Sequence, residues 1–392
     1  MKPRLLALLL PPLLFNLASC GQKEAPSAAA SGEEIVRIGA IQPLTGPQAH
    51  LGKDNENGTR MAIDDANAKG VTIGGKKIRF ELVSEDDQAD PKTATIVAQK
   101  LVDAKVNGII GHLNSGTTIP ASKIYFDAGI VQISPSATNP KYTEQGFKTA
   151  FRVMPNDVQQ GKVLGDYAFA RLGAKKIAII DDRTAYGQGV ADQFEKAAKA
   201  AGAEIVAREF TTDKSTDFMA ILTAVKSKGP DLLFFGGMDA QGGPMIKQFK
   251  SLGLNAKFLT ADGGSTPEFI KLAGGSAEGA YSSLPGLPLD QMPGGKAFGS
   301  RFTAKYGQIQ LYAPYCYDAV GVMIAAMQKA DSTDPAKYLP ALAAISHEGV
   351  TARVAFDQNG DIKDGAITLY QVKDGKWQVL ETVGGPTATP VQ

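Results

Sequence analysis

Small hydroxyl residues cluster in two segments that each follow an apolar, strand-like run. Ser115 lies in residues 111–118 (GHLNSGTT), and Ser136 and Thr138 lie in residues 134–138 (SPSAT). In open α/β sheets, ligands bind at the carboxyl ends of the strands, where helix N-termini offer free N–H groups suited to a carboxylate. The pattern therefore favours a site for a small anionic group. The same residue types also favour N-caps and turns, and either segment alone fits that structural interpretation.

The sequence lacks the motifs of several common enzyme classes. No Gly-x-Ser-x-Gly elbow, His-Glu-x-x-His helix or Walker loop occurs, and no Gly-x-Gly-x-x-Gly opens the first predicted helix. Three His and two Cys are a poor supply for a zinc site, so we expect neither a metal nor a cofactor. His112 and Ser115 are the only nucleophile–base pairing close in sequence. We therefore expect a binding protein, with a lipid-anchored hydrolase as an alternative.

Composition indicates a globular protein of two or three domains. The 392 residues are 43% hydrophobic and 21% charged, with a formal net charge of +1, which are ordinary values for folded proteins. They exclude bulk disorder, a collagen-like chain and a multi-pass membrane protein. Binding to nucleic acid needs clustered basic residues to neutralise phosphates, so we expect no nucleic-acid partner.

Predicted strands alternate with predicted helices along most of the chain. Residues 176–181 (KIAIID) are typical of a strand buried on both faces. Asp90 and Pro91 predict an N-cap and the first residue of a helix, and an apolar stripe at helical spacing over residues 190–201 ends at Gly202. This alternation predicts parallel sheets with helices on both faces. There are too many repeats for one sheet, so we predict two doubly wound lobes.

Two further element predictions concern the ends of this pattern. Residues 61–68 are predicted as a helix near the beginning, and residues 351–356 and 366–372 as two strands of a hairpin near the end. The connection at residues 357–361 (DQNGD) resembles part of a calcium loop, but the Gly and the bidentate Glu that such a loop requires are replaced. We therefore expect no calcium site there.

The first twenty residues predict export and lipidation. A basic start precedes the apolar run 5–17, which is too short and too interrupted by proline to span a bilayer. Residues 17–20 (LASC) resemble a bacterial lipobox, in which Cys20 would carry a diacylglycerol. We predict a lipoprotein signal peptide at 1–19, and the lipidated Cys with a flexible tether at 20–34. The folded part would then lie in the periplasm or cell envelope, anchored to a membrane.

Seven short motifs carry a family resemblance. They are residues 39–47 (GAIQPLTGP), 86–91 (DDQADP), 111–115 (GHLNS), 120–122 (PAS), 134–138 (SPSAT), 186–189 (YGQG) and 235–237 (FGG). In this order they resemble the periplasmic substrate-binding proteins of the leucine/isoleucine/valine-binding type, which serve ABC importers. The similarity runs from residue 35 to residue 379. It implies a type I periplasmic binding protein fold, an α/β architecture of two doubly wound parallel-sheet lobes joined by three hinge crossovers.

The resemblance also implies the boundaries of the two lobes. Lobe 1 would comprise residues 35–153 plus 284–348, and lobe 2 residues 154–283 plus 349–385. The three crossovers would lie near residues 152–155, 282–287 and 348–353. Each lobe would thus be discontinuous in sequence, with the ligand in the cleft between them.

The same resemblance implies how an amino acid's charged groups would be bound. Ser115 would bind the α-carboxylate through its hydroxyl and backbone N–H, and Thr138 would contact both carboxylate and ammonium. The carbonyl of Ser136 and the side chain of Asp262 would face the ammonium. A zwitterion that leaves water needs a partner for each charge, which fits these assignments. Asp262 also fits a solvated loop residue.

Four further residues are expected around the ligand's side chain. Tyr186 would close over the ligand from the second lobe, although a packing role beside a turn is the alternative. Leu51 and Tyr312 would line the side-chain pocket. Met238 stands where leucine-binding relatives have a Tyr near the ligand, so the pocket would carry fewer aromatic hydroxyls.

We therefore expect a lipid-anchored receptor for aliphatic amino acids, with Leu, Ile or Val preferred. Its partners would be the amino-acid ligand, the membrane that holds the anchor, and an ABC permease in the inner membrane. The alternatives are the same fold binding urea, a short-chain amide or an aromatic acid, and the hydrolase named above. Only an amino acid would need the ammonium partner Asp262.

Overall fold

The computed structural model describes residues 33–385 of the chain. The predicted signal peptide, Cys20 and the tether up to residue 32 lie outside the described residues. Within the described part, none of the helices combines the length and apolar character needed to cross a bilayer.

The first sheet has six strands in the order β2-β3-β1-β4-β5-β6. Every neighbouring pair is parallel except β2 with β3. Its strands are β1 (Glu34–Gln42), β2 (Val71–Ile73), β3 (Lys76–Asp86), β4 (Gly108–Gly111), β5 (Gln132–Ser134) and β6 (Ala150–Arg152). Its helices are α1 (Ala49–Lys69), α2 (Pro91–Asp103), α3 (Ser115–Asp127), α4 (Lys141–Glu144), α11 (Ala313–Lys329) and α12 (Pro335–Ala343).

Helices cover both faces of this sheet. Ile109 of β4 packs into the core formed with α2 and α3, while the next residue, Ile110, packs into the core that contains Met323 of α11. Because adjacent side chains of a strand point to opposite faces, both faces are buried. A β-carbon on Gly58 would lie 2.3 Å from the backbone oxygen of Ala313, so a glycine is needed where α1 approaches α11.

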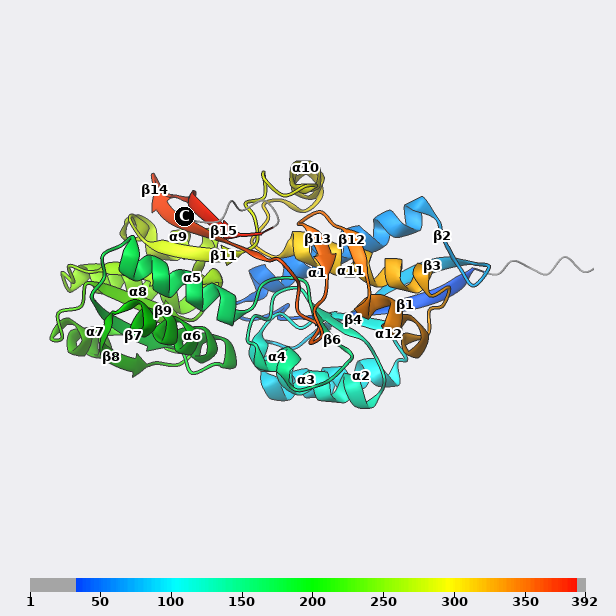
Figure 1. Cartoon of the computed structure of the whole chain (residues 1–392), viewed down its shortest axis with the longest axis horizontal. Helices are drawn as coiled ribbons and strands as arrows, with labels where there is room; N and C mark the ends of the chain where they lie inside the picture. Colours follow the sequence, from blue (N-terminus) through cyan, green and yellow to red (C-terminus); the bar gives the residue numbers. More distant parts are fainter. Residues whose placement is uncertain (1–32, 386–392) are drawn as a thin grey trace, which may run out of the picture. The chain divides into compact units, whose positions relative to one another are not determined.

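The second sheet has seven strands in the order β15-β14-β11-β10-β9-β7-β8. Its strands are β7 (Lys176–Asp181), β8 (Glu204–Phe210), β9 (Leu232–Gly236), β10 (Lys257–Thr260), β11 (Tyr281–Pro285), β14 (Ala366–Lys373) and β15 (Lys376–Gly384). Its helices are α5 (Asp157–Ala170), α6 (Ala185–Ala201), α7 (Met219–Lys226), α8 (Asp239–Ser251) and α9 (Pro267–Ala273), with the short 3₁₀ turns η1 (Asp262–Gly264) and η2 (Gly274–Ala277). β7 to β11 are parallel, β14 pairs antiparallel with β11, and β15 pairs antiparallel with β14. Figure 1 shows α6 beside β7 and β9.

Several local predictions are confirmed. The strand predicted at residues 176–181 is β7. The Asp90 side chain accepts a hydrogen bond from the backbone N–H of Thr93, and Pro91 is the first residue of α2. Gly202 ends α6 with φ at 106°, in the left-handed region. The molecule therefore has the predicted α/β class, and we call the parts built on the first and second sheets lobe 1 and lobe 2.

The hairpin predicted between residues 351–356 and 366–372 is wrong. β13 (Arg353–Ala355) pairs with β12 (Ser346–Glu348) in a separate two-stranded sheet, whereas β14 pairs with β11 and β15. The two segments end in different sheets because the loop between them is tied to lobe 1.

Three backbone segments connect the lobes. The first leads from β6 to α5, the second from β11 towards α10 (Gly295–Tyr306), and the third ends at Ala366, where β14 begins. The third lies later in sequence than the expected crossover at residues 348–353. Arg152 of β6 binds Asp361 and so holds the preceding loop against lobe 1. The exact lobe boundaries remain a prediction.

Candidate functional site

A small cavity is lined by side chains from both lobes, and we call it the head-group cavity. Lobe 1 contributes Leu113, Asn114, Ser115, Ser136 and Tyr312, and lobe 2 contributes Tyr186, Met238 and Asp262. Its free volume is about 10 Å³, which is the space of roughly one water molecule. A larger ligand can enter only if these side chains or the lobes move apart.

Ser115 lies at the start of α3, directly after the end of β4. Its hydroxyl oxygen accepts a hydrogen bond from the backbone N–H of Asn139, at 3.2 Å. The N–H groups of Ser115 and Gly116 have no acceptor among the hydrogen bonds of the described residues. These two free N–H groups and the helix dipole suit a carboxylate.

Ser136 and Thr138 lie in the segment that follows β5. The Ser136 hydroxyl donates to the backbone oxygen of Leu113 at 3.1 Å, so its side chain joins the two strand-end segments. Thr138 does not line the head-group cavity as the structure stands, but its hydroxyl is buried and has no partner in residues 33–385. The structure thus brings both hydroxyl segments together at one end of the first sheet.

Asp262 is the acidic residue of the cavity and is only 1% exposed. Tyr186 donates to its Oδ1 at 2.8 Å, and Tyr312 donates to its Oδ2 at 2.6 Å. Burial raises the pKa of Asp262 above its usual value, although the hydrogen bonds from the two tyrosines oppose this shift. Asp262 is therefore a buried residue with organised partners and not a solvated loop residue.

Asp157 lies behind the cavity lining, close enough to Asp262 for their charges to interact, and the sequence reasoning did not single it out. It lies in the first turn of α5, is fully buried, and neither of its carboxylate oxygens has a hydrogen-bond partner in the described part of the chain. Burial, followed by the nearby charge of Asp262, raises the pKa of Asp157 from its usual 3.8 to about 8. An acidic residue in a first helical turn is ordinary, since the helix dipole favours it, so the sequence offered no separate signal.

Tyr312 is positioned by a contact that is distant in sequence. Asp54 of α1 accepts hydrogen bonds from the backbone N–H groups of Leu311, Tyr312 and Ala313, each at 3.0 Å. The Asp54 carboxylate thus caps the N-terminus of α11. This cap fixes the backbone from which Tyr312 reaches Asp262.

Met238 lines the head-group cavity, whereas Leu51 does not. Met238 precedes α8, lines the head-group cavity and is 4% exposed. Leu51 is fully buried in the core of lobe 1 and is not among the residues that line the cavity. The predicted contact of Leu51 with a ligand therefore has no support from this geometry.

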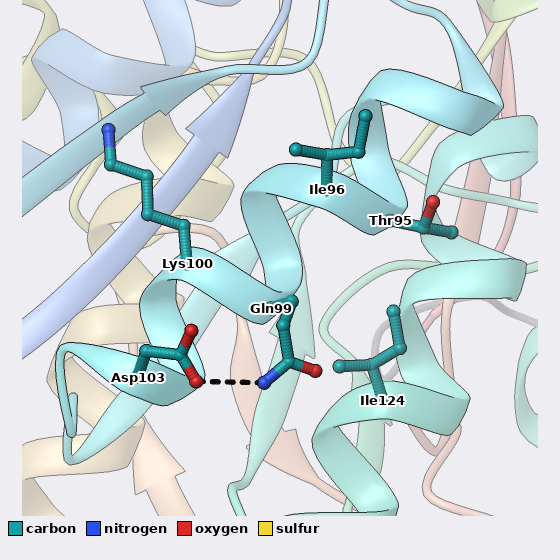
Figure 2. A pocket seen from close by; sticks show the side chains of 6 residues that line it. All are labelled: Thr95, Ile96, Gln99, Lys100, Asp103 and Ile124. Atoms are coloured by element: carbon teal, nitrogen blue, oxygen red, sulfur yellow. Dashed lines mark hydrogen bonds between the residues drawn. The ribbon is translucent and has the colours of Figure 1, made fainter.

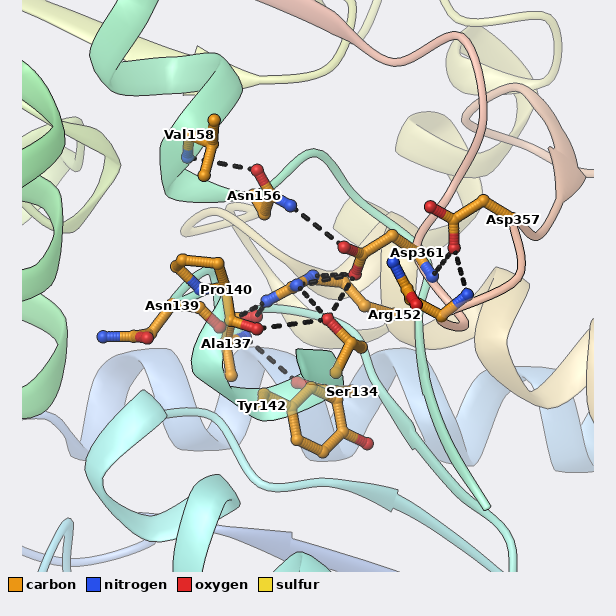
Figure 3. A network of polar contacts seen from close by, with 12 residues as sticks. Ser134, Ala137, Asn139, Pro140, Tyr142, Arg152, Asn156, Val158, Asp357 and Asp361 are labelled. Atoms are coloured by element: carbon orange, nitrogen blue, oxygen red, sulfur yellow. Dashed lines mark hydrogen bonds and ion pairs between the residues drawn. The ribbon is translucent and has the colours of Figure 1, made fainter. Parts of the chain in front are cut away.

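Arg152 organises the segment that carries Ser136 and Thr138 (Figure 3). It is fully buried and donates to Asp361 Oδ1 from two nitrogens, at 2.9 and 2.6 Å. It also donates to the backbone oxygens of Ala137 and Asn139 at 2.8 and 2.9 Å. The loop that was compared with a calcium site therefore has a structural role, because Asp361 is already satisfied by arginine.

Two polar contacts near the cavity join the lobes. His50 Nε2 lies 2.8 Å from Asp239 Oδ2, and Asn139 Nδ2 donates to the backbone oxygen of Ala185 at 2.6 Å. Burial alone would lower the pKa of His50, but the hydrogen bond and charge of Asp239, with Glu268, outweigh burial and raise it. Together with the contact between Tyr312 and Asp262, these interactions connect the lobes in the conformation seen here.

The geometry does not support a catalytic pair of His112 and Ser115. Both ring nitrogens of His112 are engaged, with Asp87 Oδ2 at 2.7 Å and the Tyr125 hydroxyl at 3.1 Å. Across residues 33–385, no cluster of three or more His, Cys, Asp or Glu is placed to bind a metal ion.

A larger hollow of about 550 Å³ lies away from this site, between α2 and α3 (Figure 2). It is lined by Thr95, Ile96, Gln99, Lys100, Asp103 and Ile124. Gln99 donates to Asp103 within the same helix, and Ile96 is 61% exposed. This shallow surface shares no residue with the head-group cavity.

Comparisons with known proteins identify a family for this chain. The family model described as periplasmic binding protein matches residues 35–376. An "Amino acid binding protein" of Pseudomonas aeruginosa is 37% identical, over 88% of this chain and 92% of that protein. The "Leucine-, isoleucine-, valine-, threonine-, and alanine-binding protein" of the same organism is 34% identical, over 86% and 90%. The crystal structure of LivJ from Streptococcus pneumoniae in complex with isoleucine has a TM-score of 0.82 at 28% identity, covering 90% of this chain and 100% of that one.

Proposed function

Because this chain belongs to the periplasmic binding protein family, we propose that it is the substrate-binding lipoprotein of an ABC importer and captures branched-chain or other aliphatic amino acids. Members of the family are solute-binding proteins and not enzymes. One observation carries the proposal. A free helix N-terminus from lobe 1 and a buried carboxylate from lobe 2 meet in the same small cavity.

The head group of the ligand is bound by complementary charges. The α-carboxylate accepts hydrogen bonds from the Ser115 hydroxyl and from the free N–H groups at the start of α3. The ammonium donates to Asp262, to the Ser136 carbonyl and to the Thr138 hydroxyl. Leaving a buried charge unpaired would cost several kcal/mol. A molecule that lacks either the carboxylate or the ammonium therefore binds this site poorly.

The ligand would favour closure of the lobes, because its contacts are divided between them. The carboxylate partners belong to lobe 1, whereas Tyr186 and Asp262 belong to lobe 2. A ligand held by both lobes stabilises the closed state relative to the open state and shifts their equilibrium. The closed form would then present a surface from both lobes to the permease.

The side-chain end of the cavity gives limited selectivity. Leu113, Met238 and the ring of Tyr186 supply apolar surface there. One methylene group in such a pocket changes binding by only ~1–3 kcal/mol. Leu, Ile and Val should therefore compete for the same site.

The anchoring part of the proposal depends on the sequence of residues 1–34. The apolar run, the small residues before Cys20 and the polar tether support a lipoprotein in the periplasm or cell envelope, anchored to a membrane.

A thermal-shift screen against the common amino acids tests the ligand class. A ligand present at 100 times its dissociation constant should stabilise the protein by ~2.7 kcal/mol. We expect the largest increases in Tm with Leu, Ile or Val. An increase with urea, an amide or an aromatic acid, and none with these three amino acids, would contradict the proposed ligand.

The substitution Asp262→Asn separates an amino acid from those alternatives. It should weaken leucine binding by roughly 10- to 100-fold, because a charged hydrogen bond contributes about 1.5–3 kcal/mol. A ligand that lacks an ammonium group should be nearly unaffected. Asp318→Asn is a matched control, since Asp318 is also buried and hydrogen-bonded but lies outside the cavity. Isothermal titration calorimetry of both variants provides the comparison.

A further inference from the structure

A second cavity, which we call the side chamber, adjoins the head-group cavity. Asn114, Tyr186 and Met238 line both spaces, so these side chains form the partition between them. The side chamber has a volume of about 380 Å³, within the range of small-molecule sites. A ligand whose head group binds at Ser115 therefore finds room for a longer side chain in this direction.

Met238 is the movable part of the partition. The Tyr186 hydroxyl is fixed, because it donates to Asp262 and accepts from the backbone N–H of Gly263 at 2.8 Å. A β-carbon on Gly263 would lie 2.8 Å from Met238 Sδ, so the thioether runs beside the backbone next to Asp262. An unbranched Met side chain adapts its shape easily, and it can turn aside while Tyr186 stays in place.

Asp182 lines the side chamber, and one of its carboxylate oxygens is buried behind the chamber wall without a partner. Asp182 is 1% exposed, and its Oδ1 accepts from the Thr184 N–H and hydroxyl at 3.0 and 2.6 Å. Its Oδ2 has no donor among residues 33–385, and the same holds for Asn114 Oδ1. A β-carbon on Gly237 would lie 3.0 Å from Asp182 Oδ2, which places this oxygen beside the residue that precedes Met238. Leaving a buried acceptor unsatisfied is costly, so a ligand donor that reached Oδ2 when Met238 moves aside would be stabilised there.

The charges around the chamber favour a cation. Asp213 adds a second, half-buried carboxylate, while Arg183 is exposed and its guanidinium lies 3.8 Å from the ring centroid of Phe210. Burial raises the pKa of Asp182 to about 6, and the charges of Asp213 and Asp181 contribute to the rise. Asp182 is therefore mostly ionised at pH 7, with no buried cation beside it in the described structure.

We propose that the side chamber is a side-chain subsite for amino acids with an extended basic side chain, whose ammonium or guanidinium group passes Met238 and binds Asp182 Oδ2. The inference rests on the proposed function, because the α-carboxylate and α-ammonium stay in the head-group cavity. It adds basic amino acids to the aliphatic ones as a second substrate class of the same receptor.

The test compares L-ornithine with L-norleucine by isothermal titration calorimetry. The two molecules have the same chain length and differ only in a terminal ammonium in place of a methyl group. We expect ornithine to bind, and Asp182→Asn to weaken ornithine by at least roughly tenfold while norleucine changes less than about twofold. The Asn side chain in Asp182→Asn keeps an oxygen that can accept from Thr184, so the turn at residues 182–184 should persist. A melting curve of the ligand-free variant checks that the fold is intact.

A pH series provides a second readout that needs no substitution. The ratio of ornithine to norleucine affinity should fall as the pH is lowered through about 6, where Asp182 becomes protonated. Both ligands carry the same α-carboxylate and α-ammonium, so effects of pH on the binding of these two groups cancel in the ratio.

The outcomes separate the inference from the proposed function. Binding of leucine without binding of ornithine overturns the basic subsite and leaves the aliphatic receptor intact. Equal weakening of ornithine and norleucine by Asp182→Asn also overturns the subsite, because Asp182 would then act on the whole site. If no amino acid binds, both proposals fail.

Discussion

Asp262 lines the head-group cavity, and a second buried acidic residue, Asp157, lies near it outside the lining. Tyr186 and Tyr312 donate to Asp262, whereas Asp157 has no donor in the described structure. Burial and their mutual repulsion raise the pKa of Asp157 to about 8, so this residue is mostly protonated at neutral pH. An arriving ammonium would favour the ionised form of both residues.

Substitution of Asp157 by Asn should separate binding from stability. We expect leucine binding at pH 8 to weaken by roughly tenfold or more, because the ammonium loses the negative charge of a second buried carboxylate close to Asp262. At high pH the same substitution should instead make the ligand-free protein more stable relative to the wild type. Between pH 4 and 8 the folded wild type binds more protons than the unfolded chain, since the pKa rises from 3.8 to about 8 on folding, and its free energy of unfolding therefore falls as the pH rises.

Urea denaturation across pH 4–8, without ligand, measures this effect. Asp157→Asn should show a smaller decline in the free energy of unfolding than the wild type does over this range. An unchanged pH profile in the variant, or unchanged leucine affinity, would remove Asp157 from the proposed site.

At the scale of elements, the network around Arg152 holds the segment after β5 against the loop at residues 357–361. Arg152 is fully buried and bonds to Asp361, while Asn156 donates to the other carboxylate oxygen of Asp361 at 2.9 Å. Because β6 and the beginning of the first crossover meet here, the network also fixes the backbone that leads to Asp157. The candidate binding residues thus depend on an ion pair that lies outside the head-group cavity.

Asp361→Ala should destabilise the protein by about 3–5 kcal/mol, because it leaves the buried guanidinium of Arg152 without its carboxylate. Asp357→Ala in the same loop is the matched control. Asp357 accepts only from backbone N–H groups of its own loop, and its loss should cost about 1 kcal/mol. Urea denaturation of both variants measures the difference, and equal losses would contradict the role given to Arg152.

The sequence predicted elements well where a local signal was complete. The buried run at residues 176–181 and the capping pair Asp90 and Pro91 each predicted an element that the structure contains. α1 was predicted only at residues 61–68 but begins at Ala49. Its first half buries polar side chains such as Asp54, so the apolar periodicity of a helix is absent there.

The features that the sequence did not predict depend on contacts between residues far apart in the chain. The predicted hairpin failed because Asp361 binds Arg152, which lies more than 200 residues earlier. For the site, the hydroxyl segments and the family resemblance identified Ser115, Ser136 and Asp262, which do line one cavity. Asp157 looked like an ordinary first-turn acid, and only its burial distinguishes it.

At the scale of the whole molecule, the proposed function makes ligand binding and closure of the lobes one event. Tyr312 of lobe 1 reaches Asp262 of lobe 2, and His50 of lobe 1 reaches Asp239 of lobe 2. The head-group cavity in this conformation holds roughly one water molecule, so an amino acid must enter while the lobes are further apart. The ligand then replaces contacts that the lobes otherwise make with each other, and its two charged groups decide whether closure is favourable.

Calorimetric titration of the protein with leucine and its two truncated analogues tests this claim most directly. 4-Methylpentanoate lacks the ammonium of leucine, and 3-methylbutylamine lacks the carboxylate. We predict that leucine binds and that each analogue binds at least roughly 100-fold more weakly, because each leaves one set of buried partners unsatisfied. Binding of 4-methylpentanoate as tight as that of leucine would contradict recognition of a zwitterion between the lobes.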